Sequence, residues 1–170
     1  MNKYKILKDK YIEVIGKKLY RIQALKDFAR VKAGDIGGYI ESESNLSQFN
    51  NAWVYGDAQV YGDARVCGDA QVCGNARVCG DAGVCGTRHY LNLGPIGSRD
   101  GYTTIYRDKN RKAMVICGCF SGNLDDFERA VHKTHAGTKY EAEYMVLIQL
   151  ARLREKEWLD EVDRRRRATN

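Results

Sequence analysis

A six-residue repeat runs through the middle of the chain, from residue 48 to residue 89. Its clean copies read Val, then Tyr or Cys, Gly, Asp or Asn, and Ala, and they begin at Val54, Val60, Val66, Val72 and Val78. A period of six fits neither the 3.6-residue period of a helix nor the alternation of an open sheet. It is typical of a parallel β-helix, in which each copy supplies a short strand and a corner. In this interpretation valine and alanine point inward, and Gly-Asp or Gly-Asn makes the turn.

The repeat resembles the hexapeptide repeat of left-handed β-helices, in which three copies complete one triangular coil. The resemblance implies that residues 18 positions apart stack, with a spacing of about 4.8 Å. Residues 36–46 look like an irregular opening turn with Ile40 and Leu46 inward, so residues 36–89 provide about three coils. So short a stack leaves apolar surface and unpaired backbone at both ends, and we expect a cap on each.

Segments on both sides of the repeat supply candidate caps. Residues 11–15 and 19–25 predict the two strands of a hairpin, because apolar residues alternate in the second of them. Beyond the repeat, residues 102–106 and 113–117 predict two strands, followed by a short helix and a long one. The predicted fold is mainly β and has three parts: an N-terminal β-hairpin cap (1–35), a left-handed parallel β-helix of about three coils (36–89), and a C-terminal α+β module of two strands and two helices (90–170).

The basic excess of the chain is confined to its first part. The sequence has 28 Lys and Arg against 22 Asp and Glu, a formal charge of +6, and residues 1–35 alone hold ten of the former and four of the latter. Nucleic acid would therefore bind at the N-terminus. Basic and aromatic residues alternate there as they would in any hairpin, so we keep nucleic-acid binding only as an alternative. Acidic residues nearly neutralise the run Arg164–Arg167, and the sequence does not show whether this run has a partner.

Neither a membrane span nor a secretion signal is predicted. Apolar runs such as 145–148 are far shorter than the roughly 20 residues that a spanning helix needs. The start of the chain is basic but lacks the apolar stretch of a signal peptide. We therefore expect a cytoplasmic protein with no membrane partner, whose six cysteines are thiols.

Four of the cysteines occupy one position of the repeat, directly after the inward valine: Cys67, Cys73, Cys79 and Cys85. Neighbours in this series lie on different faces of the coil, and in the implied stacking only Cys67 meets Cys85. Tyr55 and Tyr61 fill the same position in earlier copies, where they stack on Cys73 and Cys79. A position that accepts tyrosine is a packing position, so we predict no metal site here.

The other two cysteines form the sequence Cys117-Gly-Cys119, which would place both thiols on one face of a strand. Two thiolates do not complete a tetrahedral zinc site, and His132 or His135 would have to fold back to help. A nucleophilic Cys119 activated by His132 lacks a third group to orient the base. We predict no metal in the chain, although the sequence leaves open whether this pair has a redox or metal role.

His89 ends the last copy of the repeat and is the strongest argument for an enzyme. Hexapeptide acyltransferases use a histidine base near the edge of their β-helix, and acyl-CoA is their cofactor. Those enzymes generally have longer β-helices with a protruding loop, whereas the clean copies here hold no insertion. We interpret His89 as a capping or surface residue. No cofactor is expected unless the acyltransferase alternative holds, in which case it is acyl-CoA.

Residues 91–106 are the most unusual stretch, with the sole proline of the chain, three glycines, a Ser-Arg pair and two adjacent threonines. Glycines let backbone amides converge on an anion, and the Arg99 guanidinium can donate two parallel hydrogen bonds to it. Nearby hydroxyl groups could complete the set of groups around the anion. The candidate ligand-binding residues are Ser98, Arg99, Thr103, Thr104 and Tyr106. The alternative is a tight structural connector between the β-helix and the C-terminal module.

The last predicted helix carries a long apolar stripe. If the helix is continuous to Arg165, it is about 40 Å long, which exceeds what a small module can cover. Uncovered apolar surface of this size marks a contact with another protein. We therefore expect a dimer or trimer, with an interface that includes Tyr144, Leu147, Ile148, Trp158 and Leu159.

Three blocks together resemble a family of hexapeptide-repeat proteins from bacteria and their phages or prophages. They are residues 19–47, the repeat array, and a C-terminal block with residues 94–99, 102–106, 118–122, 124–127 and 132–135. Proteins of this family are labelled acetyltransferases or polymer-forming proteins without an established activity, so the resemblance supplies no catalytic residue. It implies a left-handed β-helix with a separate C-terminal module, and a trimer as in the enzyme relatives.

The expected function is that of a non-enzymatic, oligomeric phage or prophage accessory protein in the cytoplasm of the bacterial host. The repeat array has few reactive groups, which favours a scaffold. The C-terminal module would bind a host protein or an anionic small molecule such as a nucleotide, and the phage setting suggests a counter-defence role. The alternatives are an acyl-CoA-dependent acyltransferase and nucleic-acid binding through the basic N-terminus.

Overall fold

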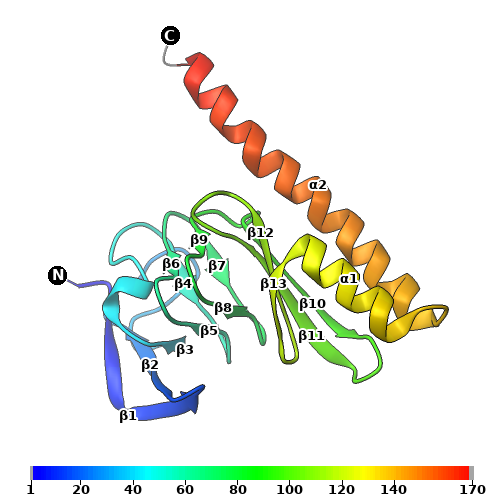
Figure 1. Cartoon of the computed structure of the whole chain (residues 1–170). Coiled ribbons are helices and arrows are strands. Elements are labelled where there is room, and N and C mark those ends of the chain that lie inside the picture. The colour runs from blue at the N-terminus through cyan, green and yellow to red at the C-terminus, as the bar shows by residue number, and fades with distance from the viewer. Residues whose placement is uncertain (1, 169–170) are drawn as a thin grey trace. The chain divides into compact units, whose positions relative to one another are not determined.

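The computed structural model describes residues 2–168 of the chain, with side chains from residue 2 to residue 161. The chain divides into two compact units, Met1–Arg88 (the first unit) and His89–Asn170 (the second unit). Figure 1 shows the first unit in blue to green and the second in green to red. The side chains of Arg164–Arg167 lie outside those described. Within the described residues, no helix combines the length and the apolar character needed to cross a membrane.

Short parallel strands build a solenoid in the first unit. They are β3 (Ile36–Ile40), β4 (Trp53–Val54), β5 (Gln59–Val60), β6 (Arg65–Val66), β7 (Gln71–Val72), β8 (Arg77–Val78) and β9 (Gly83–Val84). In three parallel ladders, β3 pairs with β5 and β5 with β8, β4 pairs with β7, and β6 pairs with β9. Paired valines such as Val54 and Val72 are 18 residues apart, so the predicted stacking of the clean copies is confirmed.

The two small apolar positions of the repeat fill the interior of the solenoid. Valines and alanines at these positions, from Ala52 to Val84, are at most 2% exposed. Fully burying one valine side chain stabilises a fold by about 1.5 to 3 kcal/mol. The corner glycines have positive φ, from 56° at Gly56 to 69° at Gly62, a conformation that strains any residue with a side chain. This requirement explains why glycine recurs in every clean copy.

The first coil is longer than the clean copies predict. Ile40 pairs with Val60 and Leu46 with Val66, so the partners are 20 residues apart rather than 18. The two extra residues lie between Leu46 and β4, where Asn50 has a positive φ of 57°. An opening turn with Ile40 and Leu46 inward is confirmed, since both are at most 1% exposed. The first coil, however, is two residues longer than the coil formed by the clean copies.

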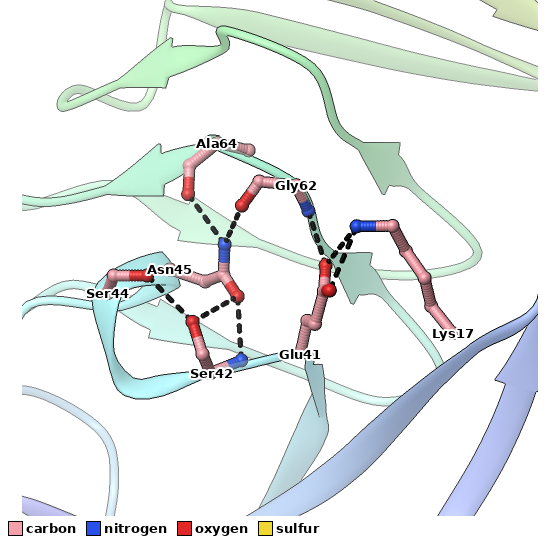
Figure 2. A network of polar contacts seen from close by, with 7 residues as sticks. All are labelled: Lys17, Glu41, Ser42, Ser44, Asn45, Gly62 and Ala64. Atoms are coloured by element: carbon pink, nitrogen blue, oxygen red, sulfur yellow. Dashed lines mark hydrogen bonds and ion pairs between the residues drawn. The ribbon is translucent and has the colours of Figure 1, made fainter.

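Polar side chains fasten the irregular coil to the next one, as Figure 2 shows. The buried Asn45 side chain donates to the carbonyl oxygens of Gly62 and Ala64 at 2.8 and 2.9 Å. Glu41 accepts hydrogen bonds from the Lys17 ammonium at 2.9 Å and from the Gly62 amide at 2.7 Å. These two bonds, with that of Lys17 first, hold the pKa of Glu41 below its usual range. The network gives backbone groups of Gly62 and Ala64, on the next coil, hydrogen-bond partners.

An N-terminal hairpin extends one face of the solenoid. Strands β1 (Tyr4–Val14) and β2 (Lys17–Ala24) pair antiparallel, and β2 pairs with β3, so one sheet has the order β1-β2-β3-β5-β8. The hairpin is confirmed, but its first strand begins at Tyr4 rather than at Tyr11. A register shift between Leu7 and Tyr11 interrupts the alternation of β1, which is why the sequence pattern reveals only its second half.

The turn of this hairpin holds a strained residue. Ile15 and Gly16 form a two-residue turn in which both residues have positive φ, 50° and 72° respectively. Turns of this type favour Asn-Gly, whereas a β-branched residue at positive φ is strained. The Ile15 side chain is 83% exposed and therefore contributes little packing in return.

We predict that Ile15→Asn raises the free energy of unfolding by about 1 kcal/mol, because asparagine tolerates the left-handed conformation. Urea denaturation of the full chain measures the change. Ile15→Val keeps the branched side chain and is the matched control, with no gain expected. Equal stability of the two variants would contradict the strain assigned to this turn.

A buried lysine covers backbone carbonyl groups at the start of the solenoid. Lys3 is 1% exposed, and its ammonium group donates to the carbonyl oxygens of Ala52, Phe49 and Asn50 at 2.7, 3.3 and 3.4 Å. Phe49 and Asn50 lie between Leu46 and β4, in the segment that makes the first coil longer. Burial, followed by the charge of Lys26, lowers the pKa of Lys3 to about 8.

The low pKa of Lys3 predicts a stability that rises with pH. Between pH 8 and the ordinary lysine pKa of 10.5, the unfolded chain binds a proton that the folded chain has released. From about pH 7 to about pH 9.5 this adds about 2 kcal/mol to the free energy of unfolding. In Lys3→Met the titration is absent, so urea unfolding at the two pH values should show a gain smaller by about that amount. An equal gain in both proteins would show that the pKa of Lys3 is not lowered.

The second unit is an antiparallel sheet with two helices packed on one face (Figure 1). Its strands are β10 (Tyr90–Ile96), β11 (Gly101–Arg107), β12 (Ala113–Cys117) and β13 (Phe120–Asn123), paired in that order. Helices α1 (Leu124–His135) and α2 (Lys139–Ala168) follow. Four strands form where the sequence predicts two. The sequence does not reveal the extra strands, because β10 contains Gly94-Pro95 at a register shift and because β13 is only four residues long.

Four of the five predicted oligomer residues lie in the core of the second unit itself. Tyr144, Leu147, Ile148 and Trp158 are at most 7% exposed and pack with residues of the sheet and of α1. Leu159 differs, since it is 38% exposed. The apolar stripe was correctly located on α2, but helical periodicity does not tell whether the stripe faces the same chain or another copy.

Candidate functional site

A pocket of about 270 Å³ opens in the second unit, between two strand turns and the helices. Its lining comes from the β10–β11 turn and the start of β11 (Ser98, Arg99, Tyr102), from the β12–β13 turn and its ends (Cys117, Cys119, Phe120), from α1 (Phe127, Val131, Thr134, His135) and from α2 (Tyr144). Most of these groups are apolar or aromatic, with a few polar groups among them. This is the usual make-up of a site for a small molecule.

Aromatic rings form one wall of the pocket. The Phe127 ring lies between those of Phe120 and Tyr144, with ring centres 5.1 and 5.6 Å away. The His135 ring stacks on the Tyr144 ring, with centres 5.6 Å apart and planes inclined by 30°. Aromatic pairs in such arrangements stabilise a structure by about 0.5 to 1.5 kcal/mol beyond the area they bury. Phe127 and Tyr144 are at most 7% exposed, so the partly exposed rings of Phe120 and His135 are the ones that this wall presents to a ligand.

The hydroxyl group of Tyr144 is engaged and stays protonated. It lies 3.6 Å from the Cys117 sulfur, which also accepts a hydrogen bond from the Thr103 hydroxyl at 3.2 Å. Burial first, and then the hydrogen bond with Cys117, raise the pKa of Tyr144 well above the ordinary tyrosine value. Tyr144 is thus neutral in the physiological range, and it serves the pocket as a wall rather than as a base.

The β10–β11 turn is held against α2 at Gly97. This residue has φ of 75°, and its amide donates to the Glu143 carboxylate at 3.0 Å. A Cβ atom at this position would lie 2.0 Å from the Tyr144 hydroxyl oxygen. Only glycine fits there, so the contact fixes the turn that carries Ser98 and Arg99.

Arg99 is the sole lysine or arginine in the pocket lining. It is exposed, and among the residues that the structure describes it makes no hydrogen bond or ion pair. Arg107 and Arg152 of the same unit, by contrast, pair with acidic side chains. An unengaged guanidinium next to an apolar wall is suited to bind a carboxylate or phosphate through two parallel hydrogen bonds.

The five predicted ligand-binding residues do not converge. Ser98 and Arg99 line the pocket, whereas alternation along β11 turns Thr103 to the helix-covered face of the sheet and Thr104 and Tyr106 to the other face. These three strand residues are at most 3% exposed, and both threonine hydroxyl groups are hydrogen-bonded within the sheet. Of the five predicted ligand-binding residues, Ser98 and Arg99 are the two that line the pocket.

The aromatic wall was missed by the sequence analysis. The sequence assigns Tyr144 to an oligomer interface and relates His135 only to a zinc site, and it gives Phe120 and Phe127 no part in ligand binding. An apolar side chain that lines a pocket has the same periodicity as one in a closed core, so the pattern does not separate the two. The usable signals were the glycine-rich turn and the nearby Cys-Gly-Cys sequence, and both turns do border the pocket.

Two of the repeat cysteines are bonded to each other. Cys67 and Cys85 stack as predicted, with Cα atoms 4.3 Å apart, and a disulfide joins their sulfur atoms. The prediction of six thiols is therefore wrong for this pair. Stacking on adjacent coils brings the two side chains within bonding reach.

The Cys-Gly-Cys pair also differs from its prediction. Cys117 ends β12 and Cys119 lies in the turn after it, so the two do not share one face of a strand. Both are free thiols that line the pocket. His132 pairs with Glu141 at 2.6 Å and not with Cys119. Across the described residues, no group of three or more His, Cys, Asp and Glu side chains is placed to hold a metal ion.

His89 belongs to the second unit and does not line the pocket. It is 8% exposed, so it is not a surface residue. Its Nε2 atom lies 3.6 Å from the carboxylate of Glu161 on α2, which also pairs with Arg107 at 3.2 Å. These contacts fasten α2 to the segment that begins the second unit.

Two adjacent segments of the first unit, residues 58–70 and 70–86, match the family model of the YdcK β-solenoid repeat. The match covers β5 to β9, the strands whose parallel pairing builds most of the three ladders. No curated protein matches the chain. A mainly β fold with a solenoid repeat and two helices agrees with this match, and over its repeat region the chain is similar to the YdcK β-solenoid repeat.

Proposed function

We propose that the protein is a non-enzymatic binding protein whose second unit takes up a small anion with a flat apolar part, such as a nucleotide. The unengaged Arg99 beside a wall of aromatic rings is the observation that carries this proposal. The rings supply a stacking surface, and the guanidinium group supplies recognition of the charge. A volume of about 270 Å³ suits a ligand no larger than about a mononucleotide.

The solenoid is the scaffold in this proposal. The interior of its clean repeat copies consists of valine and alanine side chains, which have no reactive groups. We also propose that the solenoid is left-handed and has about three coils, as the resemblance to hexapeptide repeats implies.

We further propose that the protein comes from a phage or prophage. The ligand is then a molecule of the bacterial host, and its capture is a counter-defence function.

Isothermal titration of the full chain with nucleoside monophosphates tests the proposal. We expect these to bind more tightly than the uncharged nucleosides, which lack the anion, and than inorganic phosphate, which lacks the flat part. Arg99→Ala should weaken binding by at least about tenfold, because hydrogen bonds to a charged group stabilise a complex by about 1.5 to 3 kcal/mol. The melting temperature of the free variant should be unchanged, since the exposed Arg99 makes no hydrogen bond or ion pair with the described residues.

Arg129→Ala is the matched control for this titration. Arg129 is an exposed arginine of the same unit that pairs with Asp126 and does not line the pocket. The control should bind as the wild type does. Equal affinities for wild type and Arg99→Ala, or no binding of any nucleotide, would refute the proposed site.

His89→Ala separates the proposal from the acyltransferase alternative. Because His89 lies outside the pocket lining, its replacement should leave nucleotide affinity within about twofold of the wild type. Transfer of an acetyl group from acetyl-CoA by the wild type, lost in His89→Ala, would instead establish the enzyme.

A further inference from the structure

Two thiols line the same pocket, and the proposed recognition of the anion by Arg99 does not involve them. Cys117 is the partly buried last residue of β12, and Cys119 is exposed in the two-residue turn before β13. Gly118 separates them with a positive φ of 57°, and Cys117 faces Phe120 across the hairpin. One turn therefore presents an accessible thiol next to a sheltered one.

We propose that Cys117 and Cys119 form a thiol–disulfide exchange site for anionic low-molecular-weight disulfides, of which glutathione disulfide is the type. The Cys119 thiolate attacks one sulfur of the oxidant, so that a mixed disulfide forms and one small thiolate leaves. The Cys117 thiolate then attacks the Cys119 sulfur, which forms the Cys117–Cys119 bond and releases the second small thiolate. Two protein thiols are oxidised, and one small disulfide is reduced to two thiols.

The geometry of the turn allows the internal bond. Two residues of chain span at most about 7 Å between their Cα atoms. Disulfides bridge Cα atoms up to about 6.8 Å apart. Apart from its chain neighbours Cys117 and Cys119, no residue places a heavy atom within 4 Å of the position that a Cβ of Gly118 would occupy, so the turn has open space in which to adjust.

The surroundings divide the two roles between the two sulfurs. Cys119 is exposed and meets the oxidant first, whereas the Thr103 hydroxyl donates to the Cys117 sulfur at 3.2 Å and keeps it at the pocket. Arg99 lines the same pocket and attracts an oxidant that carries carboxylates. This exchange chemistry does not depend on whether nucleotides bind.

The solenoid thiols provide an internal comparison. Cys73 and Cys79 follow valines that stack on Val54 and Val60, so each lies in a column with a tyrosine, Tyr55 or Tyr61. A mixed disulfide formed at Cys73 or Cys79 therefore has a phenol, and not a second thiol, beside it. It should persist, whereas one at Cys119 should be resolved.

Oxidation of the reduced full chain with glutathione disulfide, followed by peptide mass mapping, tests the site. In the wild type we expect Cys117 and Cys119 to be joined, with less than about a tenth of Cys119 retaining glutathione, because the second step is intramolecular. Cys117→Ser should raise the glutathione retained on Cys119 by about tenfold. Cys119→Ser should leave Cys117 a thiol under the same conditions.

Cys73→Ser is the matched control, and it should leave the Cys117–Cys119 bond unchanged. Retention of glutathione on wild-type Cys119 beside a free Cys117 would overturn the proposal. So would oxidation of Cys117 at the same rate in wild type and in Cys119→Ser. Both readouts are covalent changes at named sulfur atoms, which a merely structural role of these cysteines would not produce.

Discussion

Gly97→Ala is expected to destabilise the second unit by about 3 to 4 kcal/mol. The residue has φ of 75°, and an added Cβ would lie 2.0 Å from the Tyr144 hydroxyl oxygen. The variant must therefore strain its backbone and also push the turn away from α2. Both helices belong to the second unit, so urea unfolding followed by helical circular dichroism reports on this unit. Nucleotide affinity should fall as well, because Arg99 lies on the displaced turn.

Gly101→Ala is the control at the other end of the same turn. Its added Cβ would meet no atom within 4 Å, and its backbone is not in the left-handed region. The change in unfolding free energy should stay within about 0.5 kcal/mol. Equal losses in Gly97→Ala and Gly101→Ala would mean that the contact with Tyr144 does not fix the turn.

Trp158→Ala is expected to lower the free energy of unfolding by about 4 kcal/mol, since truncation of a buried tryptophan leaves a large cavity. Trp158 is 0% exposed and packs in the core of the second unit with Ile105, Val115 and Leu124. The same circular dichroism measurement detects the loss. Light scattering should show an unchanged molar mass, because the side chain faces the core of its own unit.

Leu159→Ala is the neighbouring control, at a position that is 38% exposed. It should cost less than about 1 kcal/mol, because an exposed side chain loses little burial when it is shortened. If Trp158→Ala kept its stability but changed the molar mass, Trp158 would belong to an interface between copies rather than to the core.

The repeat region is the part of the fold that the sequence predicts best, for a physical reason. Each corner needs a glycine with positive φ, and each inward position needs a small apolar side chain. The same residues therefore recur in every clean copy. The first coil has no clean copy, and its two extra residues went unnoticed. Loops tolerate such insertions at little entropic cost, so the pattern places no limit on their length.

The second unit was less predictable because its elements break local rules. Gly94-Pro95 marks a loop in most sequences, yet here it lies within β10, where the register with β11 shifts. β13 is only four residues long, with the sequence Phe-Ser-Gly-Asn, so neither propensity nor alternation reveals it. Both strands exist because β11 and β12 offer them backbone partners, which is tertiary information.

The candidate site was partly within reach of the sequence. Ser98 and Arg99 were identified from the glycine-rich turn, and both line the pocket. Thr104 and Tyr106 could have been removed at that stage, because alternation in the predicted strand 102–106 already directs them away from Thr103. The aromatic wall depends on how α1 and α2 pack on the sheet, which no local pattern contains.

Chemical-shift mapping by NMR tests the central claim most directly. The ¹⁵N-labelled full chain is titrated with a nucleoside monophosphate, and the backbone amide signals are followed. If the nucleotide binds in the pocket, shifts should concentrate in residues 98–102, 117–120 and 130–135, the segments that border it. Shifts that instead concentrate in the solenoid strands or around His89, with the pocket segments unmoved, would contradict it.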